Sequence, residues 1–429
     1  MNKRIWSNVL LILSVVVLMA AIPLFSACSS EKETPPTKTV EVTKEVEVTK
    51  EVEVTKIVEV TKEVEKEPVK AKVVYIGGLT GPVSKAAMRT VAGLEDGFNY
   101  VNEQGYVPGV EIVFEPLDNR YQVPTTRSLY ERNLKNTVLF IFEGPSGGHE
   151  ASKEFFARDR VPMLAQASSD PQFDPPGWIF ADSAGYGDGA VAFFDWFKQN
   201  MFNEDRPVRI GFLSWDSPYG RAGYEELKAY APQNGGEVVT IQYTTFAPTT
   251  LLPQILAFEE LGVDFIWSNT YSVTIDVMLR AMAETGIQIP LVGNSNNPAD
   301  DVLETSGTEL SQGYMSIHHW YSEDYEDDLP SEFADLLKEK GSRESGVSDV
   351  HNTWYSRGWQ DAFIAAEAMK IAVDEVGVEE LDGQAMFEAF FEIENYEAPF
   401  CGGAIGLKDA DDRRLNPEGR IYQVQGDRV

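Results

Sequence analysis

The sequence has few of the side chains that bind metals or form disulfides, with two cysteines and four histidines in 429 residues. None of the histidines is spaced for shared metal binding with a second His or Cys on a helix face. His318 and His319 are adjacent, so on a strand they would point to opposite faces. We therefore predict no metal site, and we interpret Cys401 as a small buried packing residue.

Signatures of catalysis and of cofactor binding are also missing. The sequence contains no Gly-x-Ser-x-Gly nucleophile turn and no Gly-x-x-x-x-Gly-Lys-Ser/Thr phosphate loop, and Cys401 has no evident base. An enzyme needs a nucleophile with a base, or a paired acid and base. The prediction is a protein that is not an enzyme and that carries no cofactor.

Basic residues are scarce relative to acidic ones. Lys and Arg number 36 against 68 Asp and Glu, which gives a formal net charge of −32. Such a charge argues against nucleic acid or an anionic membrane surface as a partner. We interpret it as a solvated acidic surface.

The long apolar run of the chain lies at its N-terminus. Lys3 and Arg4 precede an apolar stretch at residues 9–24, followed by Phe25-Ser-Ala-Cys28. This pattern is typical of a secretory leader, and its end is similar to the bacterial lipoprotein box. We predict a signal peptide over residues 1–28, with Cys28 as the lipidated first residue of the mature chain. An uncleaved membrane anchor is the alternative, and both place the body on the outer face of the cell membrane.

Residues 29–70 form a low-complexity stalk. Val-Glu-Val-Thr-Lys-Glu begins at Val40 and repeats at Val46 and Val52. Every other residue is charged and no aromatic side chain is present, so burial cannot offset the entropy of ordering. An extended spacer is expected, and pairing of stalks through their valines is the alternative.

The body begins with strands that alternate with helices. Apolar runs at residues 72–77, 110–114, 138–142 and 161–165 each end in a polar or Gly-rich loop. A second series has strands near 208–213, 237–243, 264–271 and 290–297, with a further strand at 314–321 and a helix at 351–376. This alternation predicts an α/β fold with two parallel sheets.

Ligands of parallel α/β sheets bind beyond the carboxyl ends of the strands. The loops around Ser146 and Ser168–Ser169 follow such ends, and Trp320 ends a later strand. Each serine could instead be an ordinary turn residue, and Trp320 could pack in the core. Two lobes in series leave one large cleft between them, which could close on a ligand by a hinge motion.

The body resembles the type I periplasmic binding proteins of the branched-chain amino-acid transporter group. The resemblance rests on Gly78-Leu-Thr-Gly-Pro, on Phe142-Glu-Gly-Pro-Ser-Gly-Gly and on Asp216-Ser-Pro-Tyr-Gly, in this order. It implies two Rossmann-like lobes joined by a three-strand hinge. We assign lobe 1 to residues 71–185 and 313–402, and lobe 2 to residues 186–312 and 403–429.

The resemblance also implies a function and a binding site. A small organic solute would bind between the lobes of a monomer, which would present it to the membrane permease of an ABC transporter. The implied ligand-binding residues are Ser146, Gly147, Ser168, Ser169, Tyr186, Tyr219, Thr270, Tyr271, Ser295 and Trp320.

One departure from the family concerns the ligand. Family members that bind α-amino acids commonly place an acid after the strand that ends here at Gly293, whereas this chain has Asn294-Ser-Asn-Asn. A branched-chain amino acid and a related amide, urea-like, aromatic or carboxylate solute all stay open. A lipoprotein that senses a ligand for a membrane signalling protein is the alternative function.

Overall fold

The computed structural model describes residues 67–166, 169–321, 352–399, 401, 403–407, 411–416 and 418–429. The predicted leader, Cys28, the stalk up to residue 66 and Ser168 lie outside these residues. Residues 66–429 form one compact unit. No helix in the described part of the chain has both the length and the apolar character needed to cross a membrane.

The first sheet has five parallel strands in the order β2-β1-β3-β4-β5. These strands are β1 (Val69–Gly77), β2 (Val110–Asp118), β3 (Thr137–Phe142), β4 (Met163–Ala165) and β5 (Ile179–Ala181). The helices of this lobe are α1 (Ser84–Glu103), α2 (Val123–Asn133), α3 (Ser146–Asp159), α11 (Thr353–Val376) and α12 (Gly383–Ala389), and η1 (Asp170–Gln172), η4 (Val378–Glu380) and η5 (Phe390–Glu392) are single 3-10 turns. The predicted strands and the predicted helix at 351–376 are confirmed.

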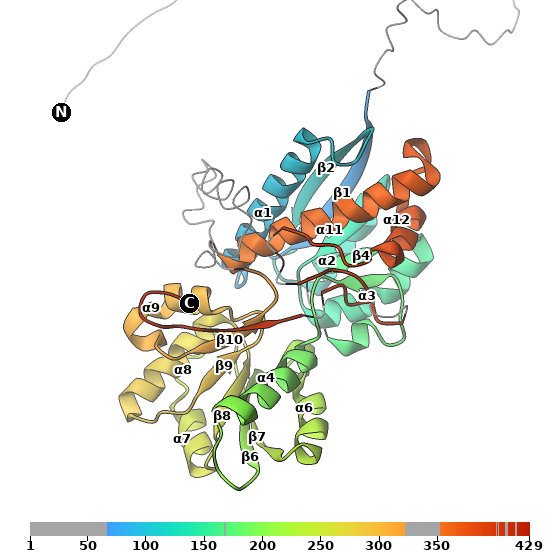
Figure 1. Ribbon diagram of the computed structural model, residues 1–429. Coiled ribbons are helices and arrows are strands. Elements are labelled where there is room, and N and C mark those ends of the chain that lie inside the picture. The colour runs from blue at the N-terminus through green and yellow to red at the C-terminus, as the bar shows by residue number, and fades with distance from the viewer. Residues whose placement is uncertain are drawn as a thin grey trace, which may run out of the picture. The chain divides into compact units, whose positions relative to one another are not determined.

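Each face of this sheet is covered by a separate helical layer. Val73 and Tyr75 of β1 pack with α1, α11 and α12, whereas Val74 and Ile76 pack with α2 and α3. Helices α1 and α11 lie side by side (Figure 1). A Cβ at Gly93 would lie 2.2 Å from the carbonyl oxygen of Tyr355, so this close approach requires glycine.

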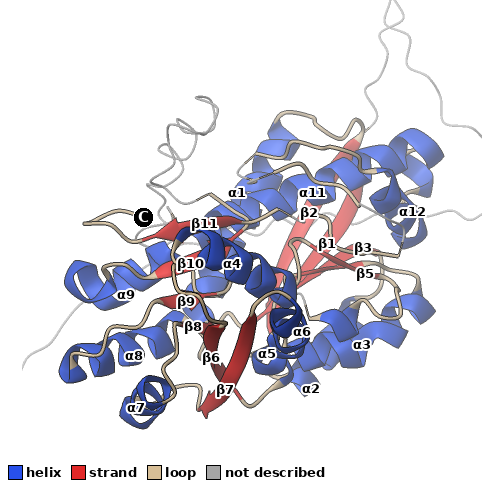
Figure 2. Cartoon of the chain, turned by 60° about the horizontal axis from the view of Figure 1, so that its bottom comes forward, coloured by secondary structure: helices blue, strands red, loops and turns tan. Residues whose placement is uncertain are grey.

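The second sheet has six strands in the order β11-β10-β9-β8-β6-β7 (Figure 2). Its strands are β6 (Val208–Trp215), β7 (Gly236–Thr244), β8 (Phe265–Asn269), β9 (Leu291–Gly293), β10 (Met315–His318) and β11 (Arg420–Gln423). All pair in parallel except β11, which is antiparallel to β10. Its helices are α4 (Tyr186–Asn200), α5 (Pro218–Arg221), α6 (Tyr224–Tyr230), α7 (Leu252–Glu260), α8 (Ser272–Thr285) and α9 (Ala299–Ser311), with the 3-10 turn η2 (Ala231–Gln233).

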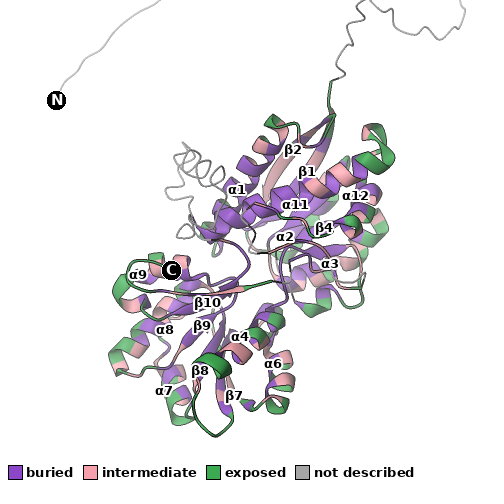
Figure 3. Ribbon diagram, in the orientation of Figure 1, coloured by how far each residue is buried: buried purple, intermediate pink, exposed green. Residues whose placement is uncertain are grey.

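The second sheet also lies between two helical layers. One core joins α7, α8 and α9 to the sheet through Ile266 and Leu291, and the other joins α4 and α6 through Phe265 and Trp267. The central strands of both sheets are buried, whereas the edge strands β2 and β7 are mostly half-buried (Figure 3). The expected fold class, α/β with two parallel-sheet lobes, is confirmed.

Two of the expected lobe boundaries are wrong. Residues 313–321 were assigned to lobe 1, but β10 pairs with β9 in the second sheet because Met315 and Ile317 complete its apolar core. Residues 403–415 were assigned to lobe 2, but Ile405 and Leu415 are buried in the core of the first sheet. The chain therefore passes between the lobes near residues 182–185, near 318–321 and near 416–419.

Candidate ligand-binding site

In each sheet the first strand has neighbours on both sides, and successive strands are added first on one side of it and then on the other. In the first sheet the point where this side changes, the switch point, lies between β1 and β3, and in the second between β6 and β8. Ligands of open α/β sheets bind beyond the strand ends at such points. The residues there are Gly77 and Glu143 in lobe 1, and Trp215 and Thr270 in lobe 2.

Aromatic side chains gather at the switch point of lobe 2. This aromatic wall consists of Tyr186, Trp215, Tyr219, Phe246 and Tyr271. Trp215 and Tyr271 are parallel with ring centroids 5.3 Å apart, and Tyr186 meets Tyr219 edge to face at 5.1 Å. The structure therefore brings together the predicted residues Tyr186, Tyr219 and Tyr271, and it adds Trp215, which sequence reasoning did not assign.

Amide side chains hold the aromatic wall from behind. The Tyr219 hydroxyl donates to the carbonyl oxygen of Thr270 at 2.8 Å and to Oδ1 of Asn294 at 3.2 Å. Nδ2 of Asn296 donates to the Tyr186 hydroxyl at 3.0 Å. The loop after β9, where an acid is common in the family, therefore positions tyrosines here. Among the predicted residues, Thr270 and Ser295 are buried in this supporting layer.

The predicted residues of lobe 1 lie at the start of α3 and beside η1. Ser146 begins α3 and is buried. Ser169 donates through Oγ to Glu150 at 3.0 Å and accepts from Nε2 of Gln172 at 2.7 Å. A Cβ at Gly147 would lie 3.3 Å from Cγ of Pro218, so this loop directly faces α5 of lobe 2.

His149 adds a buried imidazole to the same region. Its Nδ1 lies 3.3 Å from Oε1 of Gln172. Burial is the main reason that its pKa is lowered to about 4; the contact with Gln172 opposes this shift and the nearby charge of Arg357 adds to it. His149 is therefore neutral at physiological pH, so it brings no positive charge to a ligand.

Buried charges surround the switch point of lobe 1. Glu143 is the first residue after β3, and its Oε2 accepts a short hydrogen bond from the Tyr75 hydroxyl. Arg357 of α11 donates to both carboxylate oxygens of Asp182, at 2.6 and 3.0 Å. Burial raises the pKa of Glu143 to about 7; the Tyr75 hydrogen bond and Arg357 oppose this shift, and Asp182 adds to it.

Sequence reasoning assigned none of these charged residues to the site. Glu143 was visible as an acid directly after a fully buried strand. Arg357 gave no signal, because it reaches this point from a helix late in the chain.

The lobe 2 tyrosines lie close to these lobe 1 residues. Tyr271 is parallel to Trp354 of α11, with ring centroids 6.5 Å apart. Burial raises the pKa of Tyr271, and Tyr121 and Glu143 contribute smaller shifts in the same direction. Tyr121 and Trp354 are thus further residues at this point that the sequence reasoning did not assign.

Trp320 belongs to a different cluster from the aromatic wall. The Arg357 guanidinium lies over its ring at 4.3 Å, and its backbone oxygen accepts from the Tyr422 hydroxyl at 3.1 Å. It packs where the chain crosses between lobes. Among the described residues, no group of three His, Cys, Asp or Glu side chains is placed to bind a metal ion.

A comparison with protein families matches residues 70–428 to the periplasmic binding proteins. The chain belongs to the periplasmic binding protein family. Members of this family bind solutes and are not enzymes. A comparison with curated proteins finds no match to this sequence.

Solved structures share the fold of this periplasmic binding protein. One is a branched-chain amino acid ABC transporter protein from Thermus thermophilus with bound valine, at TM-score 0.75 and 21% identity, covering 85% of this chain and 95% of that one. Another is a fatty acid ABC transporter substrate-binding protein from Thermomonospora curvata, at TM-score 0.72 and 17% identity, covering 85% and 98%. A leucine-binding protein from Thermotoga maritima has TM-score 0.69 and 16% identity, covering 83% and 96%.

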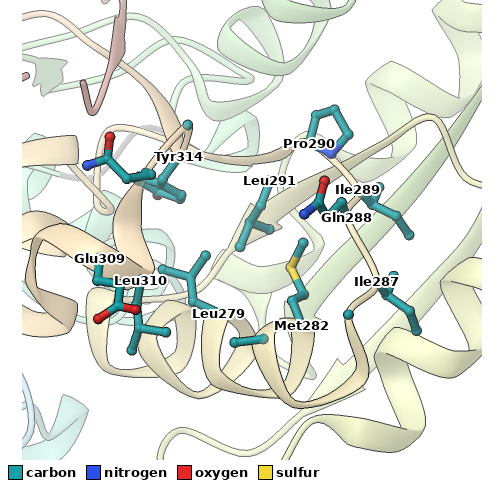
Figure 4. Close-up of a pocket in the computed structure, with 14 residues that line it drawn as sticks. Leu279, Met282, Ile287, Gln288, Ile289, Pro290, Leu291, Glu309, Leu310 and Tyr314 are labelled. Carbon is teal, nitrogen blue, oxygen red and sulfur yellow. The ribbon is translucent and has the colours of Figure 1, made fainter. Parts of the chain in front are cut away.

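A pocket of about 580 Å³ lies elsewhere in this periplasmic binding protein, between α8, α9 and the segment leading into β9 (Figure 4). Leu279, Met282, Ile289 and Leu310 line it. It lies at the amino end of β9, opposite to the strand ends that carry the aromatic wall. The strand-end rule therefore does not assign it to the ligand.

Proposed function

We propose that this periplasmic binding protein is the solute-binding receptor of an ABC uptake transporter. The solute is a small organic molecule, an amino acid or a related amide or carboxylate, held between the lobes at their two switch points. The family match supports a binding function. The fold shared with transporter proteins described as binding valine and fatty acids supports the transporter role.

One observation carries the site assignment. Buried polar atoms are normally hydrogen-bonded. The described residues contain sixteen buried side-chain polar atoms without a hydrogen-bond partner, and three of them belong to residues of this region: Oε1 of Glu143 and the indole nitrogens of Trp215 and Trp354. Tyr271 is parallel to both Trp215 and Trp354, and Glu143 is the first residue after β3 at the lobe 1 switch point. A solute with both an acceptor and a donor would satisfy these groups.

Lobe closure completes the proposed binding mechanism. Arg89 of α1 donates to both carboxylate oxygens of Glu304 in α9, at 2.8 and 3.1 Å, so an ion pair already joins the two lobes. The start of α3 presents backbone N–H groups at Ser146, where a solute carboxylate would be stabilised. Hinge closure would bring this helix end and the aromatic wall onto one solute.

We further propose that the protein is a lipid-anchored monomer on the outer face of the membrane. The leader and Cys28 support the anchor, and the stalk supports a body held away from the membrane surface. A permease in the same membrane would receive the solute.

A thermal-shift screen of amino acids, amides and carboxylates against the body is the first test, because a ligand that binds only the native state raises the melting temperature. Calorimetry with the best solute should then show that Tyr219→Ala binds at least tenfold more weakly than wild type. Leu256→Ala, which changes an exposed residue of α7, serves as the control. Equal affinity of Tyr219→Ala and wild type would refute the site, and no binding by any solute would refute the function.

A further inference from the structure

Glu143 has an unusual position for an acid. It follows the central strand β3, directly at the lobe 1 switch point, and only 4% of its surface is exposed. Its backbone N–H donates to the carbonyl oxygen of Ile76 at 3.0 Å, which fixes it beside the end of β1. A carboxylate at this point is expensive to bury unless a partner compensates its charge.

Only one of the two carboxylate oxygens of Glu143 has a hydrogen-bond partner among the described residues. Oε2 accepts from the Tyr75 hydroxyl, while Oε1 has no partner among the described residues. Arg357 is the cation that acts on Glu143, but its guanidinium already donates two hydrogen bonds to Asp182. A second acid, Asp361, receives a hydrogen bond from Gln166, and burial raises its pKa well above the ordinary value, so its neutral form is favoured. The lobe 1 switch point therefore holds one buried acid, Glu143, with a side-chain oxygen that no described residue hydrogen-bonds.

Lobe 2 offers no acid at its matching loop. The residues after β9 are Asn294, Ser295, Asn296 and Asn297, and Asn294 and Asn296 are engaged by tyrosines. The aromatic wall instead provides aromatic rings, and the π-systems of such rings attract cations. A cationic group that binds between the lobes would thus meet rings on one side and the Glu143 carboxylate on the other.

We propose that Glu143 binds a cationic nitrogen of the solute, so that lobe 1 provides the acid that is absent from residues 294–297 of lobe 2. The solute class is an organic ammonium compound, with or without a carboxylate. This inference rests on the proposed function, because it places the nitrogen in the same inter-lobe site. A purely structural role for Glu143 would leave Oε1 buried without a partner, which costs the desolvation of that oxygen.

The test uses compounds that share a carbon skeleton and differ in charge. Calorimetry on the full chain would compare L-leucine, 3-methylbutylamine and 4-methylpentanoate, and likewise L-phenylalanine, 2-phenylethylamine and 3-phenylpropanoate. We expect at least one skeleton to bind as the amine or amino acid and to bind at least tenfold more weakly as the acid alone. A charge-assisted hydrogen bond of ordinary strength accounts for a ten- to hundredfold change.

Two variants assign the effect to Glu143. Glu143→Gln keeps an acceptor for Tyr75 and should weaken amine binding at least tenfold, while leaving any binding of the matched acid unchanged or stronger. Glu131→Gln removes an acid from an exposed position of α2 in the same lobe and should bind like wild type. If Glu143→Gln fails to fold, the selectivity of the wild type among the matched compounds still decides whether the site prefers a cationic nitrogen.

The outcomes separate this inference from the proposed function. Binding of the acids as tightly as the amines, or wild-type amine affinity in Glu143→Gln, overturns the inference and leaves the receptor function standing. Binding by none of the six compounds contradicts the inference, and if the wider solute screen also finds no ligand, the proposed function fails with it.

Discussion

Arg357 and Asp182 form a buried bidentate ion pair at the first crossing between the lobes. The guanidinium donates at 2.6 and 3.0 Å, and both side chains are almost fully buried. Asp182 directly follows β5, and Arg357 lies in the second turn of α11. The pair therefore links the end of β5, where the chain leaves the first lobe, to α11, a helix that the same lobe receives later in the sequence.

Removing one partner of this pair should destabilise the protein strongly. Arg357→Ala leaves the Asp182 carboxylate buried and unpaired, which typically costs about 3–5 kcal/mol. Urea unfolding should show this loss. The double variant Arg357→Met with Asp182→Asn should recover part of it, because no uncompensated charge is left. A loss below about 1 kcal/mol for Arg357→Ala would contradict the structural role.

Glu143 should make stability depend on pH. Its pKa is raised from an ordinary 4.5 to about 7, so its protonated form is favoured in the folded state. The stabilisation from this proton is complete below pH 4.5 and is lost as pH rises through 7. Tyr75, Arg357 and Asp182 are the groups that act on it besides burial itself.

The neutral variant Glu143→Gln should lack this dependence. Its stability relative to wild type should rise by about 2 kcal/mol between pH 5.5 and pH 8.5, from the linkage between pKa and folding. Urea unfolding of both proteins at the two pH values measures this difference. Glu131→Gln, with an exposed side chain, should show no such change, and a flat difference for Glu143→Gln would refute the raised pKa.

The ion pair between Arg89 and Glu304 should contribute to solute binding. It joins α1 of lobe 1 to α9 of lobe 2, so opening of the lobes would separate it. Arg89→Ala should weaken solute binding by about three- to tenfold, consistent with a pair that is partly buried. Arg127→Ala, which removes an exposed pair within α2, should leave binding unchanged. Unchanged affinity in Arg89→Ala would show that this pair does not stabilise the closed form.

Cys28 should carry the lipid. Labelled fatty acid should be incorporated into wild type and not into Cys28→Ala, because the thiol of the first mature residue is the acceptor. Cys401→Ala is the matched control and should be labelled like wild type, since Cys401 is buried. Incorporation of label into Cys28→Ala would refute the anchor.

The sequence predicted the fold well because alternating apolar runs and Gly-rich loops are local signals. It misplaced β10 because Met315–His318 is apolar enough for either sheet, and only its pairing with β9 decides. The family resemblance implied Tyr186, Tyr219 and Tyr271 as ligand-binding residues, and the structure brings the three side chains together. Arg357 and Trp354 were not predicted, because the packing of α11 against α1, far apart in sequence, brings them to the site.

The distance between the lobes with and without solute tests the central claim most directly. Spin labels can be attached to cysteines introduced at Glu131 in α2 and at Glu260 in α7, because Cys401 is buried with a pKa raised to about 12 and will not react. In a Cys28→Ala background, addition of the solute found by the thermal-shift screen should shorten and narrow the distance distribution. Tyr219→Ala should require at least tenfold more solute for the same change. A distribution that saturating solute leaves unchanged would contradict binding between the lobes.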